Sequence, residues 1–401
     1  MKVLCLIVLC LTFSFAEGSV EEILQRLTCR CRDSQSDSVL VTQNGRVIFE
    51  YRSDPYWQPI DTSSITKSIV ALAIGMLIDE ERIASIDEPV YHFFPEWDQG
   101  RKRDITIRHL LNNTSGLQSG CTDEEIYRTS SIIQLALCAE LTSTPGTCYF
   151  SNNKAINLLT GIVKRASGRS LSEYLAVKMF APMGIDNVSW LSDPCGNEYA
   201  MSHMIITAPD LVKIGEMLVN GGLYCGRRIV SKCWIDLLTC PGQHIEPFCG
   251  MLWWMDYYNV ECWWDDALLQ QYGYAGISPQ FVGALRSLNG RVMDMNGCVR
   301  TPWGSNFFNG ETVDLLGGNE CAESFMWQVR QQGYPVARWR AGSMKSFSAR
   351  GYLGQQLIIF PGRKIVAVRQ TRSRGVDDDQ VDLFHDFGAL VEELSYKMGP
   401  Y

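Results

Sequence analysis

The chain has 401 residues, of which 46% are hydrophobic and 20% charged, so it is long and apolar enough to form a globular protein with a large core. Its formal net charge is -8, and no basic cluster offsets it. A surface of this charge argues against nucleic acid as a partner.

Residues 1–18 have the pattern of a signal peptide. Lys2 precedes an apolar run at residues 3–15, and Ser14-Phe15-Ala16 forms a small-x-small cleavage site. No other stretch approaches the roughly 20 apolar residues that a spanning helix needs. We therefore expect a secreted, extracellular protein without a membrane span, with the lysosome or another secretory compartment as an alternative location.

The cysteine count suits an oxidising compartment. There are 15 cysteines, and 15 − 2 = 13 remain after the two in the presumed signal. Because no pair has the tight C-x2-C spacing of a metal site, we predict disulfide bonds, whose pairing stays open. Asn-x-Ser/Thr sequons begin at Asn187, Asn112 and Asn113, so these are candidate glycosylation sites.

The first elements are a helix, a hairpin and a second helix. Residues 19–33 have the apolar spacing of an amphipathic helix. Residues 38–51 read as a β-hairpin, because Asn44-Gly45 suits a type I′ turn between two apolar runs. Small hydroxyl residues and a long apolar run follow, and they predict a buried helix that begins near Ser63.

The rest of the chain returns to strands after a long helical stretch. Residues of about 80–250 are mainly helical, including one helix at 124–141, and residues of about 250–335 are the least regular part, rich in Cys and aromatic residues. Strand signals at 355–360 and 364–369 precede a final helix at about 377–396. We predict an α/β (α+β) fold over residues 19–401, with an antiparallel sheet, flanking helices and an inserted helical subdomain.

Ser64 and Lys67 carry the first candidate chemistry. On a helix that starts near Ser63 they are i and i+3 and share one face. A serine is a weak nucleophile and needs a base, and a lysine serves when burial lowers its pKa. The alternative is a capping serine beside a solvated lysine; Ser151 and Lys154 show that the same spacing recurs in this chain.

A second motif follows about 87 residues later. Ser151-Asn152-Asn153 places a hydroxyl and an amide on one tight turn before a helix. Serine acyl-enzymes that use S-x-x-K carry such a Ser-x-Asn element and a third motif on a strand. The two motifs together predict a Ser-Lys hydrolase.

With these motifs the chain resembles the serine β-lactamase and penicillin-binding-protein-like hydrolase family, closest in pattern to its esterase and 6-aminohexanoate-oligomer hydrolase branch. The resemblance covers nearly all of the mature chain and implies a β-lactamase/transpeptidase-like fold. It rests on the segments Ser64-Ile65-Thr66-Lys67, 105–117, Pro145-Gly146-Thr147, 207–211 and Gly354-Gln355.

The resemblance implies roles for the residues of the first two motifs. Ser64 would be the nucleophile and Lys67 the general base. Ser151 stands where many relatives carry the tyrosine of Tyr-x-Asn, and Asn153 matches its asparagine. Because a serine is shorter and less acidic than a phenol, either Ser151 relays protons, or Tyr149 substitutes, or the site is impaired, and Ser151 as a helix cap is a further reading.

The third motif is a strand that completes the oxyanion hole. Residues 349–355 look like this strand, so the backbone N–H of Tyr352 would join that of Ser64, with Gly351 leaving room for substrate. A competing register is Arg340-Ala341-Gly342-Ser343, which has a cation where relatives have lysine. We prefer the first because a strand follows it directly.

Other groups offer less. The five histidines lack any zinc-ligand spacing, so we expect neither metal nor other cofactor, and His203 either edges the site or packs elsewhere. We predict a secreted serine hydrolase that cleaves a small-molecule ester, an amide or a peptide. The alternative is a secreted binding or structural protein that keeps the fold without efficient catalysis.

Overall fold

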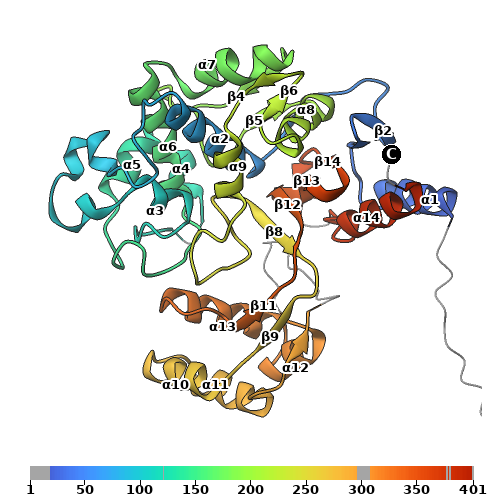
Figure 1. Cartoon of the computed structure of the whole chain (residues 1–401). Helices are drawn as coiled ribbons and strands as arrows, with labels where there is room; N and C mark the ends of the chain where they lie inside the picture. Colours follow the sequence, from blue (N-terminus) through green and yellow to red (C-terminus); the bar gives the residue numbers. More distant parts are fainter. Residues whose placement is uncertain (1–18, 121, 296–307, 376–377, 379–380, 400–401) are drawn as a thin grey trace, which may run out of the picture.

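The structure is a computed structural model that describes residues 19–120, 122–295, 308–375, 378 and 381–399. Its centre is a six-stranded antiparallel sheet of order β2-β1-β14-β13-β12-β8 (Figure 1). The strands are β1 (Ser38–Gln43), β2 (Arg46–Arg52), β8 (Trp254–Tyr257), β12 (Met344–Gly351), β13 (Gln355–Phe360) and β14 (Ile365–Gln370). The predicted antiparallel sheet is confirmed.

The predicted hairpin forms the edge of this sheet. Asn44 and Gly45 turn between β1 and β2 with φ of 51° and 74°, the left-handed values of a type I′ turn. β14 pairs with β1 on its other side, with Leu40 opposite Val368. The first and the last strand in the chain are therefore neighbours in the sheet.

Alternate residues of the strands face two different helical layers, as the period of a strand requires. On one face, Val39 and Ile358 pack with α1 (Val20–Asp33) and α14 (Phe387–Met398). On the other, Leu40 and Leu357 pack with α2 (Ile65–Asp79) and α8 (Ala208–Val219). The last helix begins at Phe387, about ten residues later than predicted.

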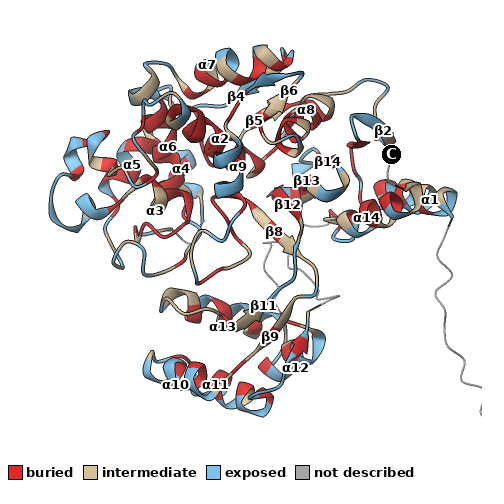
Figure 2. Ribbon diagram, in the orientation of Figure 1, coloured by how far each residue is buried: buried red, intermediate tan, exposed pale blue. Residues whose placement is uncertain are grey.

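α2 is the buried axis of the fold. Its residues are apolar all round, so it lies inside the molecule, as Figure 2 shows, and not at the surface. Gly75 lets it approach α9 (Lys232–Leu238), because a Cβ there would lie 2.1 Å from the Trp234 ring. The sequence correctly predicts this helix.

A helical region of residues 80–250 surrounds α2. It also holds small sheets, one of which supports the start of α2. Its elements are α3 (Ile107–Leu111), α4 (Glu124–Arg128), α5 (Ile132–Cys138), α6 (Asn153–Ser167), α7 (Leu171–Leu175), β4 (Val188–Trp190), β5 (Met204–Ile206), β6 (Leu223–Tyr224), β7 (Arg227–Arg228) and α9. The strand β3 (Ile60–Asp61), which lies just before α2, pairs with β5. The single helix predicted at 124–141 is wrong, because the chain breaks at residues 129–131.

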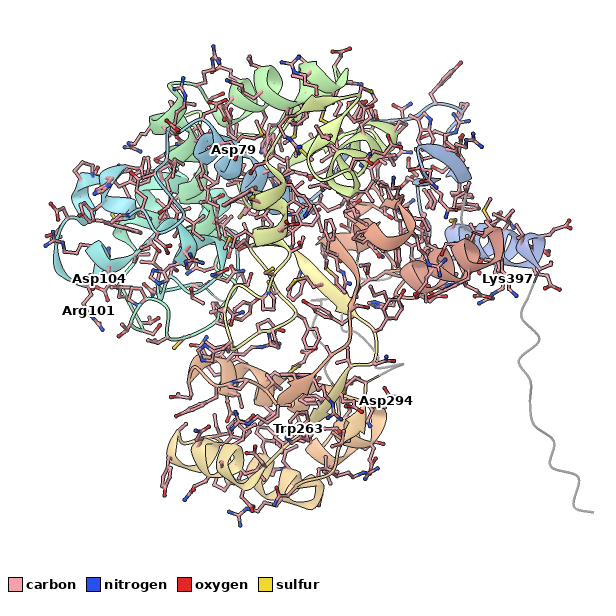
Figure 3. The ribbon with its side chains drawn as sticks, in the orientation of Figure 1. Asp79, Arg101, Asp104, Trp263, Asp294 and Lys397 are labelled. Atoms are coloured by element: carbon pink, nitrogen blue, oxygen red, sulfur yellow. The ribbon has the colours of Figure 1, made fainter. Side chains whose placement is uncertain are left out.

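Between β8 and β12 the chain builds a separate unit with its own core, which lies below the sheet in Figure 1. The prediction of little regular structure here is wrong. The unit contains β9 (Glu261–Trp263), α10 (Asp266–Tyr274), α11 (Pro279–Leu285), β10 (Met293–Asp294), α12 (Gly310–Leu316), α13 (Asn319–Gln331) and β11 (Arg338–Arg340). Because β8 and β12 pair with each other, the unit is an insertion between neighbouring strands. Figure 3 labels Trp263 and Asp294 within it.

The sequence predicts disulfide bonds and no membrane-spanning helix. No disulfide joins two cysteines of the described ranges, so the predicted disulfides stay a prediction. Cys121 and Cys298 lie outside those ranges, as does the predicted signal peptide. Over the same ranges, no helix has the length and apolarity to cross a bilayer.

Candidate active site

Ser64 sits at a sharp turn where β3 passes into α2. The preceding residue, Ser63, has a φ of 48°, a left-handed value that is uncommon without glycine. Its N–H donates to Asp61 Oδ1 at 2.8 Å, and the Thr62 N–H donates to the Met204 carbonyl at 2.9 Å. Ser64 occupies the cap position of α2 but makes no capping hydrogen bond with its side chain. Its hydroxyl is therefore not used to hold the helix.

Lys67 lies one turn further along the same helix, where its backbone N–H donates to the Ser64 carbonyl at 3.1 Å. Burial lowers the pKa of the Lys67 ammonium from 10.5 to about 8, although the Asp123 carboxylate acts in the opposite direction. At neutral pH, on the order of a tenth of such amines are unprotonated. The structure thus favours a base over the solvated lysine of the alternative reading.

The end of β12 closes over the start of α2. A Cβ on Gly351 would lie 2.6 Å from the Thr62 carbonyl oxygen and 3.0 Å from the Ser64 nitrogen. A glycine is required here because two backbone segments approach each other closely. The sequence had suggested instead that the glycine leaves room for the substrate. Gly342 of the competing register instead lies against Tyr258, within the inserted unit. The preferred register is therefore the one that reaches Ser64.

The second motif adopts a different arrangement from its capping alternative. The cap of α6 is Asn152, whose Oδ1 accepts the Ala155 N–H at 3.1 Å, so Ser151 lies outside the helix and is exposed. Asn153 donates its amide to both oxygens of Asp123 at 2.9 and 2.8 Å. The other end of that amide, Oδ1, is buried and has no partner among the described residues. It is free to accept a hydrogen bond from a ligand.

Tyr149 lies beside the site, and its side chain is almost fully buried. Its ring packs with Ile245 and Cys249, and only 7% of the residue is exposed. Burial first, and the neighbouring Cys249 and Glu246 next, raise the pKa of Tyr149 well above its usual value. The phenol is therefore neutral and acts as a donor, not as a base.

One cavity of about 1860 Å³ joins these groups. All the predicted residues of the three motifs line it, and so do both residues predicted at its edge. They are Ser64, Lys67, Ser151, Asn153, Gly351, Tyr352, Tyr149 and His203. Tyr352 is 48% exposed, so its side chain also reaches solvent.

Two carboxylates in this cavity were not predicted from the sequence. Asp123 holds Asn153 and faces Lys67. Asp61 accepts a hydrogen bond of 2.5 Å from His203 Nδ1 and also holds the turn before Ser64. Neither residue stands in a recognisable motif, because each acts through a partner brought near by folding.

Another wall is aromatic, and it combines Trp339 of the inserted unit with Tyr257 of β8 and Phe248 of the preceding loop. Phe248 packs edge-on against Trp339 with ring centres 4.9 Å apart and against Tyr257 at 5.9 Å, and all three line the cavity. Arg330 of α13 pairs with the buried Glu246 and so ties the unit to the loop that carries Cys249. The cavity therefore has a polar floor at Ser64 and an aromatic wall opposite.

Asn187 is exposed on the surface, whereas Asn112 and Asn113 are 3% and 8% exposed. The Asn112 amide also donates to the Gly242 carbonyl at 2.8 Å. A glycan on Asn112 would displace the Gly242 backbone packed against its amide. Within the described ranges, no group of three or more His, Cys, Asp or Glu residues is arranged to hold a metal ion.

An antiparallel sheet between helical layers, with a Ser-x-x-Lys helix buried beneath it, defines the class of β-lactamase-like serine hydrolases. The chain belongs to the Beta-lactamase family, whose model matches residues 24–230. This family membership confirms the resemblance inferred from the motifs.

Relatives of known sequence point to the same family. A 6-aminohexanoate-dimer hydrolase of Paenarthrobacter ureafaciens is 25% identical over 244 residues, which cover 55% of this chain and 61% of the relative. Penicillin-binding protein 4* of Bacillus subtilis (strain 168) is 26% identical over 168 residues, 37% of this chain and 36% of the relative. The matched segment thus spans less than two thirds of either relative.

Solved structures share the fold. A putative 6-aminohexanoate-dimer hydrolase from Bacillus anthracis matches with a TM-score of 0.62 and 16% identity, over 94% of this chain and 82% of the other. A penicillin binding protein from Bacillus halodurans matches with a TM-score of 0.55 and 15% identity, over 88% and 98%. At these identities the likeness shows the fold alone.

Proposed function

We propose that this chain is a secreted serine hydrolase that cleaves an ester or amide through an acyl-enzyme on Ser64. The observation that carries the proposal is the pair formed by an uncapped Ser64 hydroxyl and a Lys67 whose burial lowers its pKa to about 8. A lysine of this kind is neutral often enough to act as a base near neutral pH.

Acylation follows from this geometry. The Ser64 oxygen bonds to the substrate carbonyl carbon while Lys67 takes the Ser64 proton and passes it to the leaving group. In this proposal the N–H groups of Ser64 and Tyr352 stabilise the oxyanion, and the close packing of Gly351 on the turn before Ser64 supports it. The free Asn153 Oδ1 holds a donor of the substrate, and the exposed Ser151 lies at the mouth.

The substrate is a small-molecule ester, amide or peptide whose apolar part packs on the aromatic wall. Amide cleavage of the kind named in the 6-aminohexanoate-dimer hydrolase is one form of this chemistry. We assign no particular compound, because the cavity of about 1860 Å³ is larger than most single small molecules need.

The proposal is tested by exposing the protein to a fluorophosphonate and mapping the adduct by mass spectrometry. We expect one adduct, on Ser64, and none on the Ser64→Ala variant, which should fold normally. Ser151→Ala is the matched control and should label as the parent does. Absence of an adduct on folded parent protein would refute an activated serine.

Such a negative result would favour the second candidate, a binding protein that keeps the fold. One observation favours it specifically: Ser151 stands where many relatives carry a tyrosine, and Tyr149, although it lines the cavity, is only 7% exposed. Fold alone does not settle function.

Export completes the proposal. We propose cleavage of the signal within residues 16–18, a glycan on the exposed Asn187, and disulfides among the cysteines after export. Delivery to a lysosome or another secretory compartment is the alternative location. Mass spectrometry of the mature N-terminus checks export, and retention of Met1 would contradict it.

A further inference from the structure

One carboxylate, that of Asp61, ties two distant segments together in the cavity. Its Oδ2 accepts the His203 Nδ1–H at 2.5 Å, and its Oδ1 accepts the Ser63 N–H at 2.8 Å. Asp61 belongs to β3 and His203 directly precedes β5, and these two strands pair. The imidazole is therefore linked to the residue next to Ser64 through a single side chain.

Both segments that Asp61 binds have unusual backbone. Ser63 has a φ of 48° and His203 a φ of 70°, left-handed values for residues with a Cβ. Strained backbone of this kind persists where surrounding contacts hold it, and it gathers at functional sites. Here the contacts are the two hydrogen bonds to Asp61.

The surroundings of His203 fix its orientation. Its ring meets Tyr127 and Tyr199 edge-on, with ring centres 5.6 and 5.5 Å away. The titratable groups that face it are Asp61 from β3, Tyr127 from α4 and Tyr199 from its own loop. Burial first, and the Asp123 carboxylate next, raise the pKa of the Tyr127 phenol. Nε2 has no hydrogen-bond partner among the described residues, and His203 lines the cavity.

We propose that His203 is the second proton-transfer group of the Ser64 site and that Asp61 is its positioning residue. This inference rests on the proposed function. It answers a need that the second motif leaves open, because Ser151 is no phenol and the Tyr149 phenol is held neutral. A carboxylate on Nδ1 keeps the proton there and leaves the Nε2 lone pair for chemistry, as a buried aspartate does in serine-histidine hydrolases.

The step assigned to His203 is deacylation. A water oxygen bonds to the acyl carbon while the water proton moves to Nε2, and Asp61 stabilises the imidazolium that forms. The bond between that carbon and Ser64 Oγ then breaks, and the proton returns from Nε2 to Oγ. Free serine, neutral imidazole and one carboxylic acid product result, so no further reactant is needed.

The first test reads the imidazole itself and needs no turnover. ¹⁵N spectra are recorded on histidine-labelled Ser64→Ala protein, whose five histidines include His203, assigned through His203→Gln. In the neutral imidazole we expect the His203 proton on Nδ1. Asp61→Asn, whose amide would donate to Nδ1, should move that proton to Nε2. A proton on Nε2 in the Ser64→Ala protein, or no move in Asp61→Asn, overturns the positioning role.

The second test follows the acyl-enzyme formed from p-nitrophenyl butyrate by acid quench and mass spectrometry. In His203→Gln we expect kcat to fall about 100-fold while butyryl-Ser64 accumulates above the parent level. His244→Gln, at an exposed histidine outside the cavity, is the control and should match the parent. An unchanged kcat, or a fall without accumulation, overturns the assignment.

The two tests separate two failures. If the parent neither labels at Ser64 nor hydrolyses the butyrate, the proposed function fails and the proton-transfer role of His203 fails with it. The position of the His203 proton is still decided by the spectra. If the parent is active and His203→Gln has the same kcat and the same level of butyryl-Ser64 as the parent, the present inference alone is wrong.

Discussion

The same spacing of serine and lysine occurs twice in this chain with opposite results. Ser64 stands at the start of α2 and does not cap it with its side chain. Lys67 is buried, and none of the described carboxylates forms an ion pair with it. Ser151 lies outside its helix because Asn152 takes the cap position. Lys154 is 5% exposed and forms an ion pair of 2.8 Å with Glu125.

The difference lies in what surrounds each pair. The apolar residues of α2 withdraw Lys67 from water without a paired carboxylate, which lowers its pKa, whereas Lys154 forms an ion pair with Glu125. The strand end at Gly351 presses on Ser64. A spacing therefore nominates a site, and burial with or without a countercharge decides whether it can react.

Exchanging each lysine for methionine should produce opposite changes. Lys67→Met removes the base and should lower kcat/KM on the order of 10³-fold. Lys154→Met should leave activity within about threefold and destabilise the fold by roughly 1–3 kcal/mol, since Glu125 loses its partner. Ester hydrolysis and chemical denaturation measure both. Equal losses of activity would break the comparison.

The pKa of Lys67 also predicts how the free energy of unfolding depends on pH. It is about 8 in the folded chain and 10.5 unfolded, so the unfolded state binds more protons between these values and stability rises with pH across that window. Below pH 8 the full cost of burying the cation remains. Lys67→Met should therefore raise the free energy of unfolding at pH 7 by about 1–3 kcal/mol. In the parent, hydrolysis should increase as pH rises through about 8.

Adding a methyl group to the strand that covers Ser64 should have a smaller effect. In Gly351→Ala the new Cβ would meet the Thr62 oxygen and the Ser64 nitrogen, so the strand must shift, and we expect kcat to fall about 100-fold. Gly362→Ala is the control, because no atom lies within 4 Å of its Cβ and its φ is not positive. Activity retained in Gly351→Ala would remove the strand from the oxyanion hole.

Local patterns explain how much of the fold and the site could be predicted. Asn44-Gly45 fixes the hairpin, and the apolar run after Ser64 fixes α2, because turn chemistry and burial are written in adjacent residues. The motif residues reach one cavity for the same reason. Each is held at the end of an element whose boundary the sequence shows.

Contacts between distant residues were not predictable. Asp61 meets His203 across 142 positions, and Asp123 meets Asn153 across 30, and no spacing rule connects them. The inserted unit was missed for another reason. Its core includes large aromatic side chains such as Tyr272 of α10 and Phe325 of α13, whose irregular spacing hides the helices that bear them.

The smallest expected effect concerns the caps of the two helices. Asn152→Ala loses the bond to the Ala155 N–H and the buried bond from its amide to the Leu117 carbonyl at 2.7 Å, so it should cost about 1–3 kcal/mol of folding free energy, with little change in kcat. Ser64→Ala removes no cap bond, so its free energy of unfolding should stay within about 0.5 kcal/mol of the parent. Urea denaturation of the two variants measures this. A loss of 1 kcal/mol or more in Ser64→Ala would show that its hydroxyl holds the helix after all, and the contrast between the two serines would then rest on the lysines alone.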